Sequence, residues 1–263
     1  MKAHKWCLLV FGWVTVLFSS VVHAETLHFA TIDYCPFTCN PDKESGKEGF
    51  MTDVLRKALE EAGYALRVEM HPYVRAVREV RDGKYDGIVV VGKDYAPDLV
   101  YPDMPTVVQR VVFLTATDTS WNYTGVESLR NAKVGIVRGF HYVDPDLIAY
   151  LEHNQTDPTK VLVMHGENTT ERGVSMLQTN RITTFLEGEY SARYVLRKMG
   201  ILDSIRVAGF TRNAFEDYTG FSPKNPDASR FARILSNKIQ ELKQSGRLAD
   251  ILSRYGITPV VAN

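Results

Sequence analysis

Few side chains in this sequence form a pattern typical of catalysis. No nucleophilic residue stands beside a base, no glycine-rich loop is suited to hold phosphate, and no pair of carboxylates has a spacing that demands acid–base chemistry. Glu187, His141 and Asp33 could act as a general acid or base only if their surroundings shifted their pKa values. The sequence therefore favours binding over catalysis, and we expect neither an enzyme nor a cofactor.

Cys35 and Cys39 are the next candidates for chemistry. They are the only cysteines left if an N-terminal leader carrying Cys7 is removed. A structural zinc site would need further ligands at recognisable spacing, and the histidines are scattered along the chain. In an oxidising compartment a close pair is typical of a disulfide, which here would close a very small loop and hold it in shape. We expect a disulfide and no metal.

Residues 1–24 have the pattern of a cleaved secretory signal. Lys2 and Lys5 flank the start of an apolar stretch at residues 6–18, and small residues end at Ala24. An uncleaved membrane anchor is the alternative, but about 18 or more apolar residues are usually needed to span a bilayer, and this stretch is shorter. We expect cleavage after Ala24, a periplasmic location and no membrane insertion of the mature chain.

Two later segments, residues 73–92 and 171–188, share one pattern. Each begins with apolar residues at helical spacing, passes through a turn at Gly83 or Asn180, and ends in a short β-rich run. Either the chain builds one unit of helix, turn and buried strand twice, or a common α/β element recurs by chance.

The remaining elements predict two lobes. A strand at residues 27–32 precedes a helix at residues 54–62, for which Asp53 is the predicted N-cap. Residues 205–210 would be the last strand of a second α/β series, and the helix at residues 228–245 packs best if the chain has returned to the first. We therefore predict a second lobe inserted into the first, with lobe 1 at residues 25–114 and 212–263 and lobe 2 at residues 115–211.

Several motifs along the chain are specific in their order and spacing. They are GFMTDVL at residues 49–55, RAV at 75–77 leading to DGKYDG at 82–87, VGIVRG at 134–139, and IQELKQSG at 239–246 ending in RYG at 254–256. Together they resemble the extracellular solute-binding proteins of family 3, the periplasmic receptors of polar amino-acid ABC importers. The resemblance covers nearly all of residues 25–256.

The resemblance implies an α/β fold of the type II periplasmic binding proteins, with two lobes, a hinge of paired strands and a central cleft. The residues it suggests for ligand binding are Asp33, Tyr34, Phe37, Tyr73, Arg75, Gly92, Lys93, Gly139, Phe140, His141, Tyr142 and Glu187. Alternatives stay open: Tyr34 and Phe37 would either stack on a ligand or cover the core, and Arg75 would either bind or serve structure. The turn at residues 139–142 would either receive an anionic group at a helix start or be an ordinary turn.

The sequence also departs from the family at two positions. Amino-acid receptors of this family usually carry an arginine where Tyr95 stands, to hold the α-carboxylate, and an aspartate where Thr183 stands, to hold the α-amino group. Loss of a desolvated charged partner commonly costs several kcal/mol, so ordinary α-amino acids are expected to bind poorly. Lys93, His141 and Glu187 are candidates to replace these anchors.

The expected function is capture of a small polar solute, amino-acid-like or other, for an ABC importer. A sensor subunit of a signalling system and a dehydratase-type enzyme on the same fold are the alternatives. The 31 basic and 31 acidic residues balance, so no global field favours nucleic acid. We expect a monomer whose partners are a small solute and an ABC permease or membrane receptor.

Overall fold

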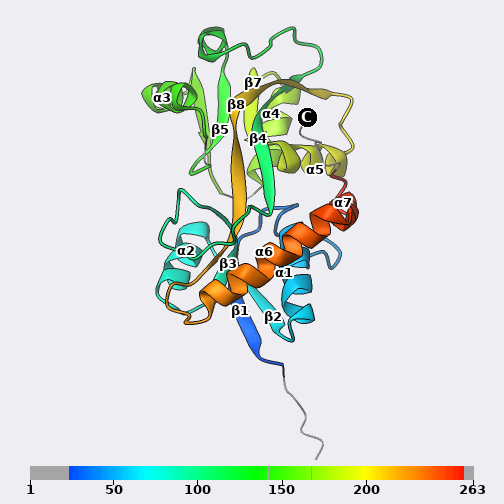
Figure 1. Cartoon of the computed structure of the whole chain (residues 1–263). Coiled ribbons are helices and arrows are strands. Elements are labelled where there is room, and N and C mark those ends of the chain that lie inside the picture. The colour runs from blue at the N-terminus through cyan, green and yellow to red at the C-terminus, as the bar shows by residue number, and fades with distance from the viewer. Residues whose placement is uncertain (1–23, 141, 167, 258–263) are drawn as a thin grey trace, which may run out of the picture.

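The computed structural model describes residues 24–140, 142–166 and 168–257. Their strands form one eight-stranded sheet in the order β2-β1-β3-β8-β4-β7-β5-β6, and Figure 1 shows helices packed around both ends of it. The predicted leader, apart from Ala24, lies outside the described residues. Within them, no helix has the length and apolar character needed to cross a bilayer.

Lobe 1 contains the first three strands of the chain. Strand β1 (Thr26–Thr31) pairs in parallel with β2 (Ala65–Met70) and β3 (Gly87–Gly92), and the helices α1 (Phe50–Glu61) and α2 (Tyr73–Arg81) lie between these strands in the chain. Parallel strands need such crossover helices, and each helix buries one face.

Helix α1 begins earlier than the sequence predicted. Asp53, the predicted N-cap, lies in the first turn, and Gly49 occupies the cap position with a φ of 96°. A Cβ on Gly49 would lie 2.4 Å from the carbonyl oxygen of Phe37, so the backbone here approaches too closely for any side chain. The Asp53 carboxylate instead accepts a hydrogen bond of 3.0 Å from the Tyr255 hydroxyl. The cap prediction was therefore wrong, because a tertiary contact sets where this helix starts.

Lobe 2 repeats the plan of lobe 1. Strand β5 (Val134–Val137) pairs in parallel with β6 (Val161–Met164) and β7 (Thr184–Gly188), and α3 (Pro145–Asn154) and α4 (Thr169–Gln178) lie between them in the chain. The other elements of this lobe are the 3₁₀-helix η1 (Val126–Asn131) and the helix α5 (Glu189–Met199).

The repeated sequence pattern corresponds to α2–β3 in lobe 1 and α4–β7 in lobe 2. After each helix the chain turns through a left-handed residue, Gly83 with φ of 80° and Asn180 with φ of 52°. The buried strand that follows then pairs in parallel with the first strand of its own lobe. The predicted helix, turn and buried strand are thus present in both places.

Two long antiparallel strands run from one lobe to the other. Strand β4 (Val107–Ala116) pairs with β8 (Ile205–Phe221) along its whole length (Figure 1). At their ends β8 also pairs with β3 of lobe 1, and β4 also pairs with β7 of lobe 2. The sequence predicted that the strand at residue 205 ends at residue 210. That prediction was wrong, because the exposed residues after Thr211 stay hydrogen-bonded to β4 although their side chains leave the core.

The C-terminal helices α6 (Ala228–Gln244) and α7 (Arg247–Ser253) return to lobe 1. Phe231 of α6 packs in the same core as Phe29 of β1. Lobe 2 has its own apolar clusters, including one around Phe185. Each lobe is therefore stabilised by its own buried core.

Candidate functional site

A cleft of about 1200 Å³ opens between the lobes. Its walls come from the segments at the carboxyl ends of β1, β2, β3, β5, β6 and β7, together with part of β8. Ligands of open α/β sheets bind beyond this end of the strands, and solute sites are typically concave and few per protein. The cleft is therefore the candidate site.

The structure brings most of the predicted ligand-binding residues to this cleft. On its lining are Asp33, Tyr34, Tyr73, Gly92, Lys93, Gly139, Phe140 and Glu187. Phe37 lies in the lobe 1 core, and the exposed Arg75 pairs with Glu79 through a 3.0 Å hydrogen bond. Tyr142 is buried, and its hydroxyl accepts a hydrogen bond from the Val137 N–H. His141 lies outside the described residues.

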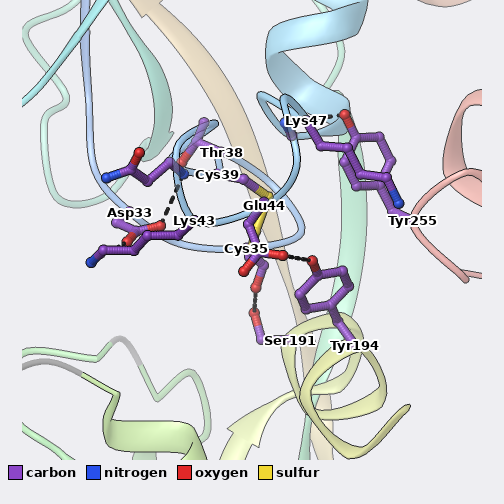
Figure 2. Close-up of a disulfide and its surroundings, with 12 residues drawn as sticks. Asp33, Cys35, Thr38, Cys39, Lys43, Glu44, Lys47, Ser191, Tyr194 and Tyr255 are labelled. Atoms are coloured by element: carbon purple, nitrogen blue, oxygen red, sulfur yellow. Dashed lines mark hydrogen bonds and ion pairs between the residues drawn. A yellow bond between two sulfur atoms is a disulfide. The ribbon is translucent and has the colours of Figure 1, made fainter. Parts of the chain in front are cut away.

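The loop after β1 contains the predicted disulfide between Cys35 and Cys39 (Figure 2). The rings of Tyr34 and Phe37 stack with their centroids 4.8 Å apart. Phe37 is fully buried, whereas Tyr34 lines the cleft. Phe37 therefore covers the core, whereas Tyr34 lines the cleft. The sequence left both of these roles open for the two residues.

Glu187, at the end of β7, is a carboxyl group buried against the cleft. It is 2% exposed, and its oxygens accept hydrogen bonds from the Thr170 hydroxyl at 2.6 Å and the Gly188 N–H at 2.8 Å. Burial raises the pKa of Glu187 to about 7, and the charge of Glu171 adds to the effect. Near neutral pH this carboxyl can therefore take up or release a proton.

Asp217, on β8, is a second buried carboxyl group, which the sequence analysis missed. It is 6% exposed, and its Oδ2 accepts a 2.8 Å hydrogen bond from the side-chain amide of Gln109 on β4. Among the described residues its Oδ1 has no hydrogen-bond partner. Burial raises the pKa of Asp217 to about 7. A continuous strand through residues 211–217 is the signal that could have revealed it, and the exposed side chains of β8 conceal that strand in the sequence.

The Tyr34 hydroxyl lies near both carboxyl groups. Burial raises its pKa well above the usual value, and the charges of Glu187 and Asp217 raise it further. Its oxygen is buried and makes no hydrogen bond of standard geometry in the described part of the chain, although the side chains of Ser191 and Gln109 lie close enough to lower its pKa. Gly188 leaves room for it, because a Cβ there would lie 3.0 Å from the Tyr34 oxygen and 2.9 Å from Oε1 of Gln109. Polar groups from three segments thus converge at the base of the cleft.

Aromatic rings line both walls of the cleft. On the lobe 1 side the rings of Tyr73 and Tyr95 have centroids 4.7 Å apart, and Tyr95 is 43% exposed. On the lobe 2 side Phe140 and Phe215 meet edge to face at 5.9 Å. Aromatic faces attract apolar groups and also cations.

The cations on the lining are exposed, in contrast to the two buried carboxyl groups. They are Lys43, Lys93, Arg138 and Lys198. Lys43 forms a 3.3 Å salt bridge with Asp33, and Lys198 pairs with Glu44. The ammonium group of Lys93 lies over the rings of two tyrosines. Among the described residues, the lysines and the arginine of the lining therefore lie at the solvent-facing part of the cleft.

The structure corrects the predicted anchor positions. Tyr95 lines the cleft, but Thr183 lies at the opposite end of β7, where its N–H donates a 2.8 Å hydrogen bond to the Lys133 carbonyl. Glu187 stands at the cleft end of the same strand instead. The register that placed the missing anchor at Thr183 was therefore wrong, whereas Glu187, one of the predicted replacements, lines the cleft. The motif comparison assigned the position near the start of the strand, whereas only the carboxyl end of a strand reaches the cleft.

The turn at residues 139–142 does not begin a helix. Helix α3 starts only at Pro145, and the N–H of Phe140 already donates a hydrogen bond of 3.2 Å to the Val137 carbonyl. Gly139 turns the chain with a φ of 77°. The described part of this segment is thus an ordinary turn on the cleft wall, which was one of the two alternatives considered.

No family model and no curated protein matches the sequence. Among solved structures, a histidine kinase sensor domain with similarity to periplasmic binding proteins aligns with a TM-score of 0.67 and 14% identity, over 90% of this chain and 99% of its own. The GluR0 ligand-binding core in complex with L-glutamate aligns with a TM-score of 0.67 and 16% identity, over 88% of this chain and 98% of its own. The ancestral amino acid-binding protein AncCDT-1, a precursor of cyclohexadienyl dehydratase, aligns with a TM-score of 0.64 and 16% identity, over 88% and 94%.

These similarities show the fold. The chain is an α/β protein with the type II periplasmic-binding-protein fold, as the family resemblance implied. They also agree with the sequence resemblance to solute-binding proteins of family 3.

Proposed function

We propose that this protein binds a small polar solute in the cleft between its lobes and releases it chemically unchanged. The observation that carries the proposal is the convergence of Tyr34, Glu187 and Asp217 at the base of a cleft of about 1200 Å³. Buried polar groups with unused hydrogen-bonding capacity cost free energy unless a ligand engages them. A cleft of this size accommodates a solute of amino-acid size or somewhat larger.

Binding is proposed to close the lobes around the solute. The boundaries of this proposal are residues 25–114 and 212–263 for lobe 1 and residues 115–211 for lobe 2. The pairing of β4 with β8 supports it, because both crossings lie in one antiparallel ladder that can bend as a hinge. Closure would exclude water and strengthen each polar contact inside.

We propose that the protein acts in the periplasm and delivers its solute to an ABC importer. The Cys35–Cys39 disulfide supports an oxidising compartment. Sensing is the second candidate, because a histidine kinase sensor domain shares the fold. A deletion strain that loses uptake of the solute would favour delivery. A strain that keeps uptake but loses the transcriptional response to the solute would favour sensing.

We propose binding without turnover. Glu187 and Asp217 could exchange protons with a bound molecule, and one neighbour in fold is described as a dehydratase precursor. Yet no nucleophile–base pair accompanies them in the sequence, and an ionisable group alone is weak support for catalysis. Mass spectrometry of the solute after long incubation with the protein tests this point, and the expected result is an unaltered mass.

A thermal-shift screen followed by calorimetry tests the proposed function. The panel contains amines, amino acids, dicarboxylates, polyols and small peptides. The true ligand is expected to raise the melting temperature, since binding at one hundred times Kd stabilises the folded state by about 2.7 kcal/mol. If no compound in any of these classes shifts the melting temperature or gives binding heat, the proposal of solute binding is contradicted.

A further inference from the structure

Among the described residues, two charged groups are buried at the cleft, and both are carboxyl groups. Glu187 and Asp217 have almost no exposed surface, whereas the cations of the lining are exposed. No described cation forms a salt bridge with either carboxyl group. An ionised carboxylate in such surroundings is costly unless an opposite charge is brought to it. The base of the cleft therefore lacks a positive group that a ligand could supply.

Unused hydrogen-bonding capacity lies at the same point. Oδ1 of Asp217 has no partner in the described part of the chain, and the buried Tyr34 oxygen makes no hydrogen bond of standard geometry there, with the side chains of Ser191 and Gln109 beside it. Tyr73 lines the same cleft, where burial raises its pKa and the charges of Tyr95 and Asp217 add to that effect. An N–H donor at the base of the cleft would satisfy the free carboxylate oxygen of Asp217.

The walls above this base are apolar and aromatic. Val74 and Val108 line the cleft and are 69% and 46% exposed, so they offer apolar surface to a ligand. The Tyr73–Tyr95 pair stands on one wall and the Phe140–Phe215 pair on the other. These surfaces suit the hydrocarbon or aromatic part of a ligand, whose charged end points to the base.

We infer that the solute is an organic cation without a carboxylate, namely an amine or guanidine on an aromatic or alkyl body. The inference rests on the proposed function. The charged nitrogen lies against Asp217 and Glu187 and donates to the free carboxylate oxygen of Asp217. The body of the solute lies between the tyrosine and phenylalanine pairs.

A zwitterionic amino acid fits this geometry less well. Its carboxylate would find no buried lysine or arginine among the described residues of the lining, because Lys43, Lys93, Arg138 and Lys198 are all exposed. A bare metal ion fits poorly too. The described residues contain no group of three or more histidine, cysteine or acidic side chains placed to hold one.

Ligands that share a body but differ in charge test the inference. Tyramine, tyrosine and 4-hydroxyphenylacetate present one ring with a cationic, a zwitterionic and an anionic end, and agmatine and arginine form a second matched set. Calorimetry with the full chain is expected to give at least tenfold tighter binding for tyramine than for tyrosine, or for agmatine than for arginine. The anion is expected not to bind. Tighter or equal binding of the zwitterions would overturn the inference.

Neutral variants assign the binding to the buried carboxyl groups. Asp217→Asn and Glu187→Gln are each expected to weaken binding of the preferred amine at least tenfold. Asp118→Asn, which removes the same charge from an exposed position outside the cleft, is expected to leave binding unchanged. Circular dichroism confirms that each variant is folded. Equal affinity of the folded Asp217→Asn variant and the wild type would overturn the inference.

The two proposals fail in distinguishable ways. If amino acids, dicarboxylates or polyols bind but the amines do not, the ligand class inferred here is wrong and solute binding stands. If no class binds, solute binding itself is contradicted and the inference falls with it.

Discussion

At the scale of single residues, the carboxyl groups of Glu187 and Asp217 determine how the cleft responds to pH. Burial raises the pKa of each to about 7. Thr170 and the Gly188 N–H donate hydrogen bonds to Glu187, and Glu171 opposes its ionisation. Gln109 donates to Asp217. Without a bound cation, ionisation of these groups therefore opposes folding.

The sign of the pH effect follows from proton binding. Between about pH 4 and pH 7 the folded state holds protons that the unfolded state has released, so the free energy of unfolding falls as pH rises and levels off above pH 7. A shift of this size corresponds to on the order of 3 kcal/mol per group. Without ligand, the Glu187→Gln and Asp217→Asn variants each lack one of the two carboxyl groups, so each avoids that group's share of the fall in the free energy of unfolding.

We expect each of these variants to match the wild type near pH 4 and to melt at a higher temperature at pH 8. Thermal denaturation across this pH range measures the difference, and Asp118→Asn is the control. A difference between variant and wild type that stays constant with pH would show that neither carboxyl group has a raised pKa.

At the scale of elements, the loop after β1 connects the two lobes directly. The Ser191 hydroxyl of α5 donates a 3.0 Å hydrogen bond to the Cys35 carbonyl, and Tyr194 of α5 donates to Glu44 (Figure 2). Lys198 of the same helix also donates to Glu44. The disulfide braces this loop, which also positions Tyr34 at the cleft. The loop therefore holds a lobe 1 wall of the cleft against a helix of lobe 2.

Removing the disulfide is expected to weaken both stability and binding. A Cys35→Ser/Cys39→Ser double variant should lose about 2 kcal/mol or less, because the closed loop is short. Its affinity for the ligand should also fall, because Tyr34 is less firmly placed. Melting curves and calorimetry with and without reductant measure both effects, and the double variant should be insensitive to reductant. Wild-type protein shown by mass to be fully reduced, yet with unchanged melting and affinity, would contradict this role.

At the scale of the whole molecule, the sequence predicted the architecture better than the site. The apolar periodicity and the left-handed turn residues Gly83 and Asn180 revealed the unit that both lobes share, since local backbone preferences set it. Tertiary contacts set the rest. The packing of Gly49 on Phe37 moved the start of α1, and cross-strand pairing carried β8 past residue 210.

Tertiary contacts also explain why the sequence analysis missed Asp217. Its environment is made by Gln109 from β4, by Tyr34 from the loop after β1, and by burial under both lobes. Each of these partners lies more than a hundred residues before Asp217 in the sequence. Residues at strand ends, such as Lys93 and Gly139, could be placed at the cleft from motif position. A polar residue in the middle of a strand between the lobes carries no such signal.

The central claim is that a solute is held in the cleft between the lobes, and a crystal structure with the tightest-binding compound of the screening panel tests it most directly. The account expects that compound, chemically intact, within the cleft and in contact with Asp217 and Tyr34. The same compound found on an outer surface, with the cleft empty at saturating concentration, would contradict the account.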